Sequence, residues 1–195
     1  MACLSKIQSA ITYDCDSGNT GLLSALLINK EDIASFGFSP TNASLVTDIE
    51  LKAGALAYKI DTVKRTLVIA ESLKINEGAP NAYTHTATVV VTAPSVSVSG
   101  DRISILFRDI INPFANGSFV ILTRGLAPIS QTDSPYLIRA FGLYYGMSAT
   151  AVDRSSHDNG AWYTITMATP ERVIGEETLR VGASVYDTLY SAAVG

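Results

Sequence analysis

The sequence predicts a mainly β protein: a β-sandwich or barrel with one amphipathic helix packed on it and a long β-hairpin. Three observations lead to this prediction. Apolar and polar residues alternate in several short segments, as they do in half-buried strands. Glycine, proline and asparagine clusters separate these segments. Only residues 100–112 show the 3.6-residue apolar repeat of a helix.

The clearest strands are expected within residues 136–168. Tyr163, Ile165 and Met167 alternate with Trp162, Thr164 and Thr166, which is the period of a half-buried strand. Asp158-Asn159-Gly160 tolerates positive φ and suits a turn between antiparallel strands. For the aromatic pairs Tyr144-Tyr145 and Trp162-Tyr163 we expect alternation to place one ring of each pair in the core.

A long hairpin is expected over residues 45–75. Apolar residues alternate from Leu45 through Ile60, the polar residues 61–65 mark a reversal, and residues 66–75 run back. Strands of this length exceed the usual five or six residues. Such strands either reach for a neighbouring molecule or fold over their own sheet.

The remaining elements are predicted more coarsely. Residues 21–29 form a strand, although their Leu and Ala content would also suit a short helix. We expect irregular structure at 1–19, loops at 30–44, 76–82 and 125–135, strands at 84–92 and 118–123, a last strand over 179–185, and a frayed tail at 191–195.

The predicted helix carries one apolar stripe, made by Ile103, Leu106, Phe107, Ile110 and Ile111. Ser99 or Asp101 can cap its start. We expect it to end at Asn112-Pro113, because a residue before proline avoids the α region. A lone amphipathic helix in a β-rich chain usually closes an open sheet face.

Composition points to a single domain over residues 1–195, since one core commonly serves about 100–200 residues. The chain is 47% hydrophobic and only 16% charged, whereas soluble domains carry about 25% charged residues. Either partner proteins cover part of the surface, or Ser, Thr and Asn supply its polarity. We favour the first explanation slightly.

Charge and hydropathy exclude several classes of function. The net charge is −4 and no basic cluster exceeds Lys64-Arg65, so the chain lacks what a protein needs to grip nucleic acid phosphates. The N-terminal residues do not read as a secretory signal, and no window of about 20 apolar residues predicts a membrane-spanning helix. Without such a signal we expect Cys3 and Cys15 to be reduced, although the two could form a disulfide.

No catalytic, metal or cofactor site is predicted, so we expect a protein that is not an enzyme. Ser155, His157 and Asp158 are close in sequence, but the members of a catalytic triad converge from separate elements. The pairs Glu176-Glu177 and Asp14/Asp16 are most simply isolated surface carboxylates. Two cysteines and the distant His85 and His157 do not make a zinc set.

Several short motifs resemble structural proteins of tailed bacteriophages that infect Bacteroidetes-type bacteria, and within that group tail tube proteins. They are Met1-Ala-Cys-Leu, Ile11-Thr-Tyr-Asp-Cys15, Phe141-Gly-Leu, Asp153-Arg-Ser-Ser and Asp158-Asn-Gly-Ala-Trp-Tyr-Thr-Ile-Thr. Where the family pattern has Gly-Gly-Ile, this chain reads Gly18-Asn19-Thr20-Gly21-Leu22.

The resemblance implies a β-sandwich or barrel of the tail-tube type. It also implies a structural virion protein that assembles with itself into stacked, hexameric rings, the tail tube through which DNA passes. Its partners would be further copies and other tail proteins, with DNA as a non-specific passing cargo. Its place would be the virion tail, assembled in the cytoplasm of the host bacterium. Sheets from neighbouring subunits would then join edge to edge.

Two alternatives stay open: a head–tail connector or other virion structural protein, and a β-sandwich module that binds carbohydrate or a cell surface. Exposed aromatic residues gathered on one face would favour the binding module, and unpaired sheet edges would favour the tube. The candidate contacts between subunits are the hairpin reversal and one loop: Asp61, Thr62, Val63, Lys64, Arg65, Glu77, Gly78, Ala79, Pro80 and Asn81.

Overall fold

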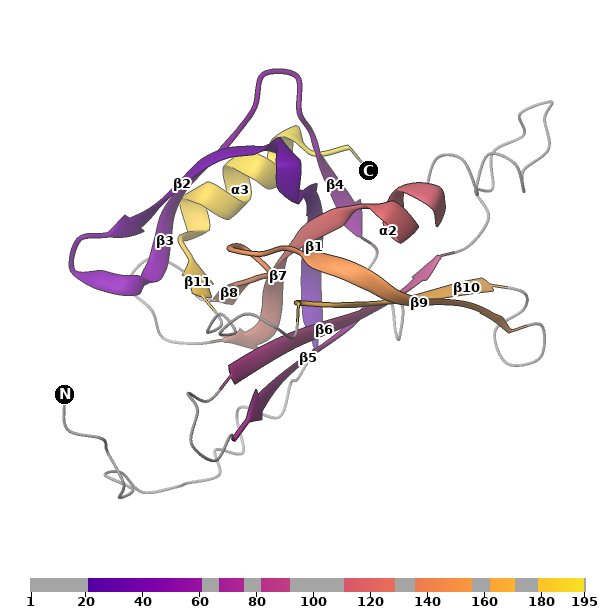
Figure 1. The fold of residues 1–195 in the computed structure, drawn as a ribbon. Coiled ribbons are helices and arrows are strands. Elements are labelled where there is room, and N and C mark those ends of the chain that lie inside the picture. Colours follow the sequence, from indigo (N-terminus) through magenta and orange to yellow (C-terminus); the bar gives the residue numbers. More distant parts are fainter. Residues whose placement is uncertain are drawn as a thin grey trace.

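The computed structural model describes residues 21–60, 67–75, 82–91, 111–128, 136–155, 162–170 and 179–194. Their strands form one eleven-stranded sheet, and the helices are short (Figure 1). The prediction of a mainly β fold is therefore confirmed.

The strands are β1 (Leu22–Asn29), β2 (Ile33–Ser39), β3 (Asn42–Leu51), β4 (Ala57–Ile60), β5 (Leu67–Lys74), β6 (Ala82–Val91), β7 (Ser118–Pro128), β8 (Tyr136–Phe141), β9 (Met147–Ser155), β10 (Trp162–Ala168) and β11 (Leu179–Val181). The helices are the 3₁₀ turn η2 (Lys30–Asp32), α2 (Asn112–Asn116) and α3 (Ala183–Ala192).

The sheet follows the order β2-β3-β11-β8-β7-β9-β10-β6-β5, and β1 joins it at β7 and carries β4 on its other side. Strand β7 therefore has β1 along one side, and β8 and the start of β9 along the other. Every pairing between two described strands is antiparallel except the short parallel one between β11 and β3, and the isolated bridge from Tyr58 to Val194 is also parallel.

Strands β1 and β7 form a wall between two hydrophobic cores. In β1, Leu26 and Ile28 belong to the first core, while Ala25 and Leu27 belong to the second. In β7, Val120 and Leu122 alternate in the same way with Phe119 and Ile121. Strands buried on both faces read as continuous apolar runs instead of alternating ones. This explains why the segment 21–29 also resembled a helix.

Strands β9 and β10 confirm the clearest sequence prediction. They pair antiparallel over the length of β10, with one register shift near Thr166. Ile165 and Met167 are fully buried in the second core, and Thr164 and Thr166 lie half-exposed on the other face. The proposed turn residues 158–160 lie outside the described residues.

The hairpin predicted over residues 45–75 is wrong in its pairing. Strand β3 pairs with β2, β4 pairs with β1, and β5 pairs with β6. A long hairpin does exist, but β2 and β3 form it around the turn Pro40-Thr41, in a region expected to be a loop. The alternation within β2 rests on Phe36 and Phe38 alone, among small residues.

The helix boundary near residue 112 was also wrong. Residues 101–110 lie outside the described part, but Asn112–Asn116 is helical and Pro113 occupies its first turn. Proline is tolerated there, because an N–H in the first turn has no partner within the helix. Ile111 and Phe114 are buried in the second core.

The C-terminal region differs from its prediction as well. The last strand ends at Val181, and α3 follows instead of further strand. Residues 191–194 are not a frayed tail: Ser191 and Ala192 complete α3, and Val194 pairs with β4. Strand β7 likewise continues to Pro128, into the predicted loop 125–135.

Candidate assembly surfaces

The residues predicted to contact other subunits, 61–65 and 77–81, lie outside the described part of the chain. Their neighbours are described. Residues 61–66 join β4 to β5 and residues 76–81 join β5 to β6. Both predicted contacts therefore flank the same strand, β5, and the sheet edges determine what that strand can do.

The edge at β4 is covered by the chain itself. The Lys59 N–H donates to the Val194 carbonyl at 2.8 Å, and the Val194 N–H donates to the Ala57 carbonyl at 3.0 Å. These bonds satisfy main-chain groups that would otherwise offer a template for another strand.

The edge at β2 is irregular. Its pairing with β3 shifts register three times, between Ile33 and Ser35, between Gly37 and Phe38, and between Phe38 and Ser39. Bulges of this kind bend and twist a strand, which makes its edge a poor template for regular strand addition.

The edge at β5 is regular. Residues 67–74 pair with β6 in eight consecutive steps without a register shift, and no other described strand pairs with β5. Val68, Leu73 and Ile75 are 53%, 46% and 78% exposed. A long, regular, apolar edge is the arrangement most prone to add a strand from another molecule.

The outer face beside this edge is almost uncharged. One row across the sheet runs Ala151, Thr166, Thr88, Val68, and the next runs Ser148, Ala168, Thr86, Ala70. Threonine and valine suit such a pleated surface because they are β-branched. The opposite face of these strands is packed on the second core.

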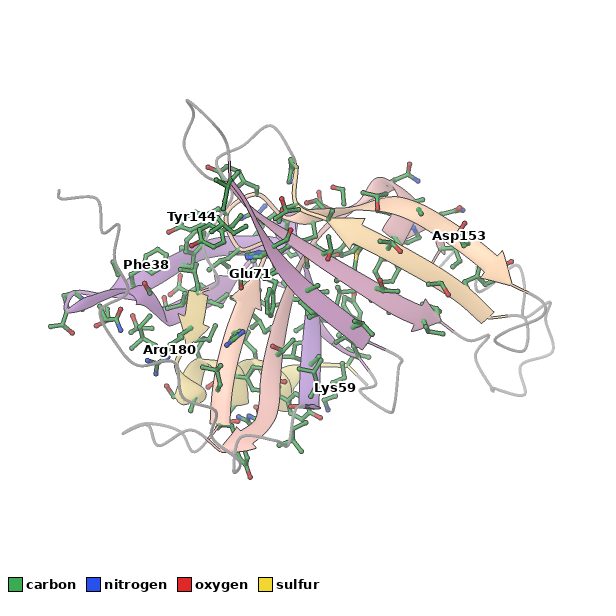
Figure 2. All side chains as sticks on the ribbon, turned by 90° about the horizontal axis from the view of Figure 1, so that it is seen from below. Phe38, Lys59, Glu71, Tyr144, Asp153 and Arg180 are labelled. Atoms are coloured by element: carbon green, nitrogen blue, oxygen red, sulfur yellow. The ribbon has the colours of Figure 1, made fainter. Side chains whose placement is uncertain are left out.

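A second surface is formed by four aromatic rings, which we call the aromatic patch: Phe36, Phe38, Tyr144 and Tyr145. Phe36 meets Phe38 and Tyr144 edge-on at 5.7 and 5.5 Å between ring centroids, and Phe38 stacks on Tyr144 at 6.0 Å. Figure 2 shows Phe38 and Tyr144 close together.

The expectation that one ring of the Tyr144-Tyr145 pair lies in the core was wrong. Both tyrosines belong to the turn between β8 and β9, not to a strand, and they are 44% and 46% exposed. Side-chain alternation does not apply in a turn, so both rings can face solvent.

The turn that holds these tyrosines is built by two glycines. Gly142 and Gly146 both have φ of +73°, a conformation that L-residues with side chains rarely adopt. The Gly146 N–H donates to the Gly142 carbonyl at 2.8 Å and closes the turn. Both glycines are buried, so the tyrosines project from a packed support.

One cation lies beside the patch. The Lys30 Nζ is 5.5 Å from the centroid of the Phe36 ring, within the range of a cation–π contact. Lys30 precedes β2 in η2, and its stem packs near the turn, 3.3 Å from where a Cβ on Gly146 would lie.

The most connected polar cluster anchors α3. The Tyr186 hydroxyl donates to Ser24 Oγ at 2.8 Å, the Arg124 guanidinium lies 4.6 Å from the Tyr186 ring centroid, and Arg124 pairs with Asp187. Burial raises the pKa of Tyr186 above its ordinary value, although the bond to Ser24 opposes that effect. These contacts fasten α3 to β1 and β7.

Few of the catalytic or metal-binding candidates considered from the sequence lie among the described residues. Asp153 lies exposed on β9, and His85 is buried edge-on to Phe141 at 5.3 Å between centroids. Across the described ranges no three His, Cys, Asp or Glu residues are placed to hold a metal ion. Cys3, Cys15, Asp14, Asp16, His157, Asp158, Glu176 and Glu177 lie outside those ranges.

The comparisons with known proteins give no match. No family model, curated protein or solved structure matches the chain. Within the described residues, no helix is long and apolar enough to span a membrane.

Proposed function

We propose that this protein is a structural virion subunit that assembles with itself into stacked rings, hexameric in the tail tube, through which DNA passes. The observation that carries the proposal is the regular edge of β5, with the exposed aliphatic side chains Val68 and Leu73 on it and Ile75 directly after it. In a monomer such an edge is a liability, whereas in a ring a neighbouring subunit can cover it.

The difference between the three sheet edges supports a specific contact between subunits at β5 instead of non-specific aggregation. Val194 covers β4 and register shifts distort β2, while β5 keeps an undistorted ladder. Proteins that function as monomers usually protect such edges from pairing with charged residues, prolines or bulges. A subunit that assembles must leave one of them intact.

The charge distribution fits DNA as a passing cargo. The chain carries a net charge of −4, and the outer face of β5, β6 and β10 presents Thr, Val and Ala. Phosphate binding needs clustered Lys and Arg. A tube surface of this composition would let DNA slide past without binding it.

The test compares two lysine substitutions on one row of the sheet. Val68 and Thr88 face each other across β5 and β6, but only Val68 lies on the edge strand. We expect wild-type protein to form rings or tubes at high concentration, seen by electron microscopy and sedimentation velocity. Val68→Lys should reduce assembly at least about tenfold, because a charged edge resists strand addition.

Thr88→Lys is the matched control and should assemble like wild type. If wild-type protein stays monomeric at high concentration, the proposed function is wrong. Rings that never stack would favour the head–tail connector.

One observation favours the second candidate, a carbohydrate-binding module. Exposed aromatic rings on a firm support are the groups that stack on sugar faces, and the aromatic patch provides two tyrosines of this kind. Affinity electrophoresis in polysaccharide gels tests it: retardation that disappears in Tyr145→Ser, by a protein that does not assemble, would support binding over the tube.

A further inference from the structure

We propose that the aromatic patch of one copy receives strand β5 of a second copy. This inference rests on the proposed function, and it names the two surfaces that meet between subunits. The occupant is a second copy of this chain, because the chain itself presents an exposed aliphatic strand that matches the patch.

The patch is preorganised for binding. Tyr144 and Tyr145 stand on a turn fixed by two left-handed glycines and a main-chain hydrogen bond, and Phe36 and Phe38 belong to a strand. Rings held in place lose little conformational entropy when a partner arrives. Tyrosine and other aromatic residues are also the types that dominate binding energy at protein interfaces.

The side chains of β5 have the complementary chemistry. Leu73 on β5 and Ile75 directly after it lie on one face and are aliphatic, and they are 46% and 78% exposed; Val68 lies on the other face. Burying such side chains against aromatic rings removes apolar area from water on both partners, at roughly 25 cal/mol per Å². Tyrosine adds a hydroxyl that can stay solvated at the rim.

The charges also complement each other. Lys30 lies at the patch, where its Nζ is 5.5 Å from the Phe36 ring centroid. Glu71 is exposed on β5, between Val68 and Leu73 in sequence. Opposite charges on two meeting surfaces fix their register and speed their encounter.

The positions of the two surfaces in the sheet favour a head-to-tail contact. The patch includes the Phe36 and Phe38 side chains of β2, the first strand of the main path, and its partner surface lies on β5, the last. The contact is made by side chains, so it does not require the irregular edge of β2 to accept a strand. Because the two surfaces differ, each copy that binds through one keeps the other free for a further copy. Contacts of this kind build closed rings or open filaments.

A charge exchange tests the pairing directly. Lys30→Glu and Glu71→Lys should each place like charges together and weaken assembly about tenfold, measured by sedimentation velocity. The double variant, with both changes in one chain, should regain most of the lost assembly. Thermal unfolding of each monomer checks that the subunits stay folded. A double variant no better than the single ones would overturn the pairing.

A mixing experiment tests the same contact without charge. Tyr145→Ser damages the patch, and Ile75→Ser removes the aliphatic side chain directly after β5; both positions are exposed. Each variant alone should stop assembling, whereas an equimolar mixture should give dimers, because one intact patch meets one intact strand.

The outcomes separate this inference from the proposed function. Wild-type rings together with unimpaired assembly of both serine variants would overturn the inference and leave the function standing. A Tyr145→Ser protein that assembles normally but no longer binds polysaccharide would also overturn it, in favour of a carbohydrate ligand. Wild-type protein that never assembles would overturn both.

Discussion

Gly146 is more constrained than any ordinary turn glycine in the described part of the chain. Its φ is +73°, and an added Cβ would overlap with Ser118 Oγ. We expect Gly146→Ala to lower the free energy of unfolding by more than the roughly 1–2 kcal/mol that a left-handed alanine costs. Urea unfolding measures the difference.

Gly54 provides the matched control, since its φ is +81° and an added Cβ would meet nothing within 4 Å. Gly54→Ala should therefore show the conformational cost alone, about 1–2 kcal/mol. Adding Ser118→Ala to Gly146→Ala should recover part of the loss. Equal losses at the two glycines would contradict the overlap.

A second prediction for a single residue concerns the hydrogen bond of Tyr186. Its hydroxyl donates to Ser24 Oγ at 2.8 Å, so Tyr186→Phe should cost about 0.5–1.5 kcal/mol near neutral pH. Denaturant unfolding of the two proteins measures this cost.

We also expect the contribution of Tyr186 to folding stability to depend on pH. Burial raises the folded pKa of Tyr186, so the unfolded chain loses this proton first as the pH rises past about 10. The folded state is then disfavoured from that pH upward, and unaffected by this group below it. The advantage of wild type over Tyr186→Phe should shrink above pH 10. A constant difference up to pH 12 would contradict the raised pKa.

Single positions were predictable from sequence where one sheet face is buried. The segment from Trp162 to Met167 was predicted by alternation alone to be a half-buried strand, and Ile165 and Met167 within it are fully buried. Tyr144 and Tyr145 were misassigned because the strand pattern was extended across a turn. Gly142 and Gly146, which bracket the two tyrosines, were the signal that could have corrected the error.

At the scale of elements, α3 was missed because its sequence carries two periods. Val181, Ala183 and Val185 alternate like a strand, whereas Tyr186, Leu189 and Tyr190 recur at helical spacing. The structure follows the second pattern, because Tyr186 and Leu189 are the residues that α3 buries. Short windows cannot decide between such patterns; the core that receives the side chains decides.

The segment after α3 supplies a prediction about β4. Removing residues 193–195 deletes the two main-chain hydrogen bonds between Val194 and β4. At about 0.5–1.5 kcal/mol for each bond, the shortened chain should lose roughly 1–3 kcal/mol of stability. Urea unfolding measures the loss, and light scattering should show more association, because the β4 edge is then open.

Val194→Ala is the control for that truncation. The side chain of Val194 is half-exposed and its main chain makes both bonds, so the substitution should cost much less than the deletion. If both changes lower the free energy of unfolding equally, the Val194 side chain and not its main chain holds the C-terminal segment on β4.

At the scale of the whole molecule, the sequence indicated that strands exist but not which strands pair. The hairpin of residues 45–75 failed because each of its strands found a different partner: β3 pairs with β2, β4 with β1 and β5 with β6. Periodicity reports which face of a strand is buried. It carries no information on the neighbour, which is set by long-range packing.

The candidate assembly surfaces also depend on long-range packing. The loops 61–65 and 77–81 were chosen from turn chemistry, and they flank β5, whose open edge appears only once the sheet order is known. The aromatic patch likewise joins β2 to a turn about one hundred residues later in the chain. No local pattern could have brought those rings together.

The central wall has a consequence for synthesis in the cell. Leu22 at the start of β1 pairs with Gly125 in β7, so about one hundred residues separate the two partners. At 5–20 residues per second, a ribosome needs roughly 5–20 s to make that stretch. During this time β1 can pair only with the four residues of β4, and its apolar run has no second cover. The nascent chain is therefore a natural client for chaperones until β7 emerges.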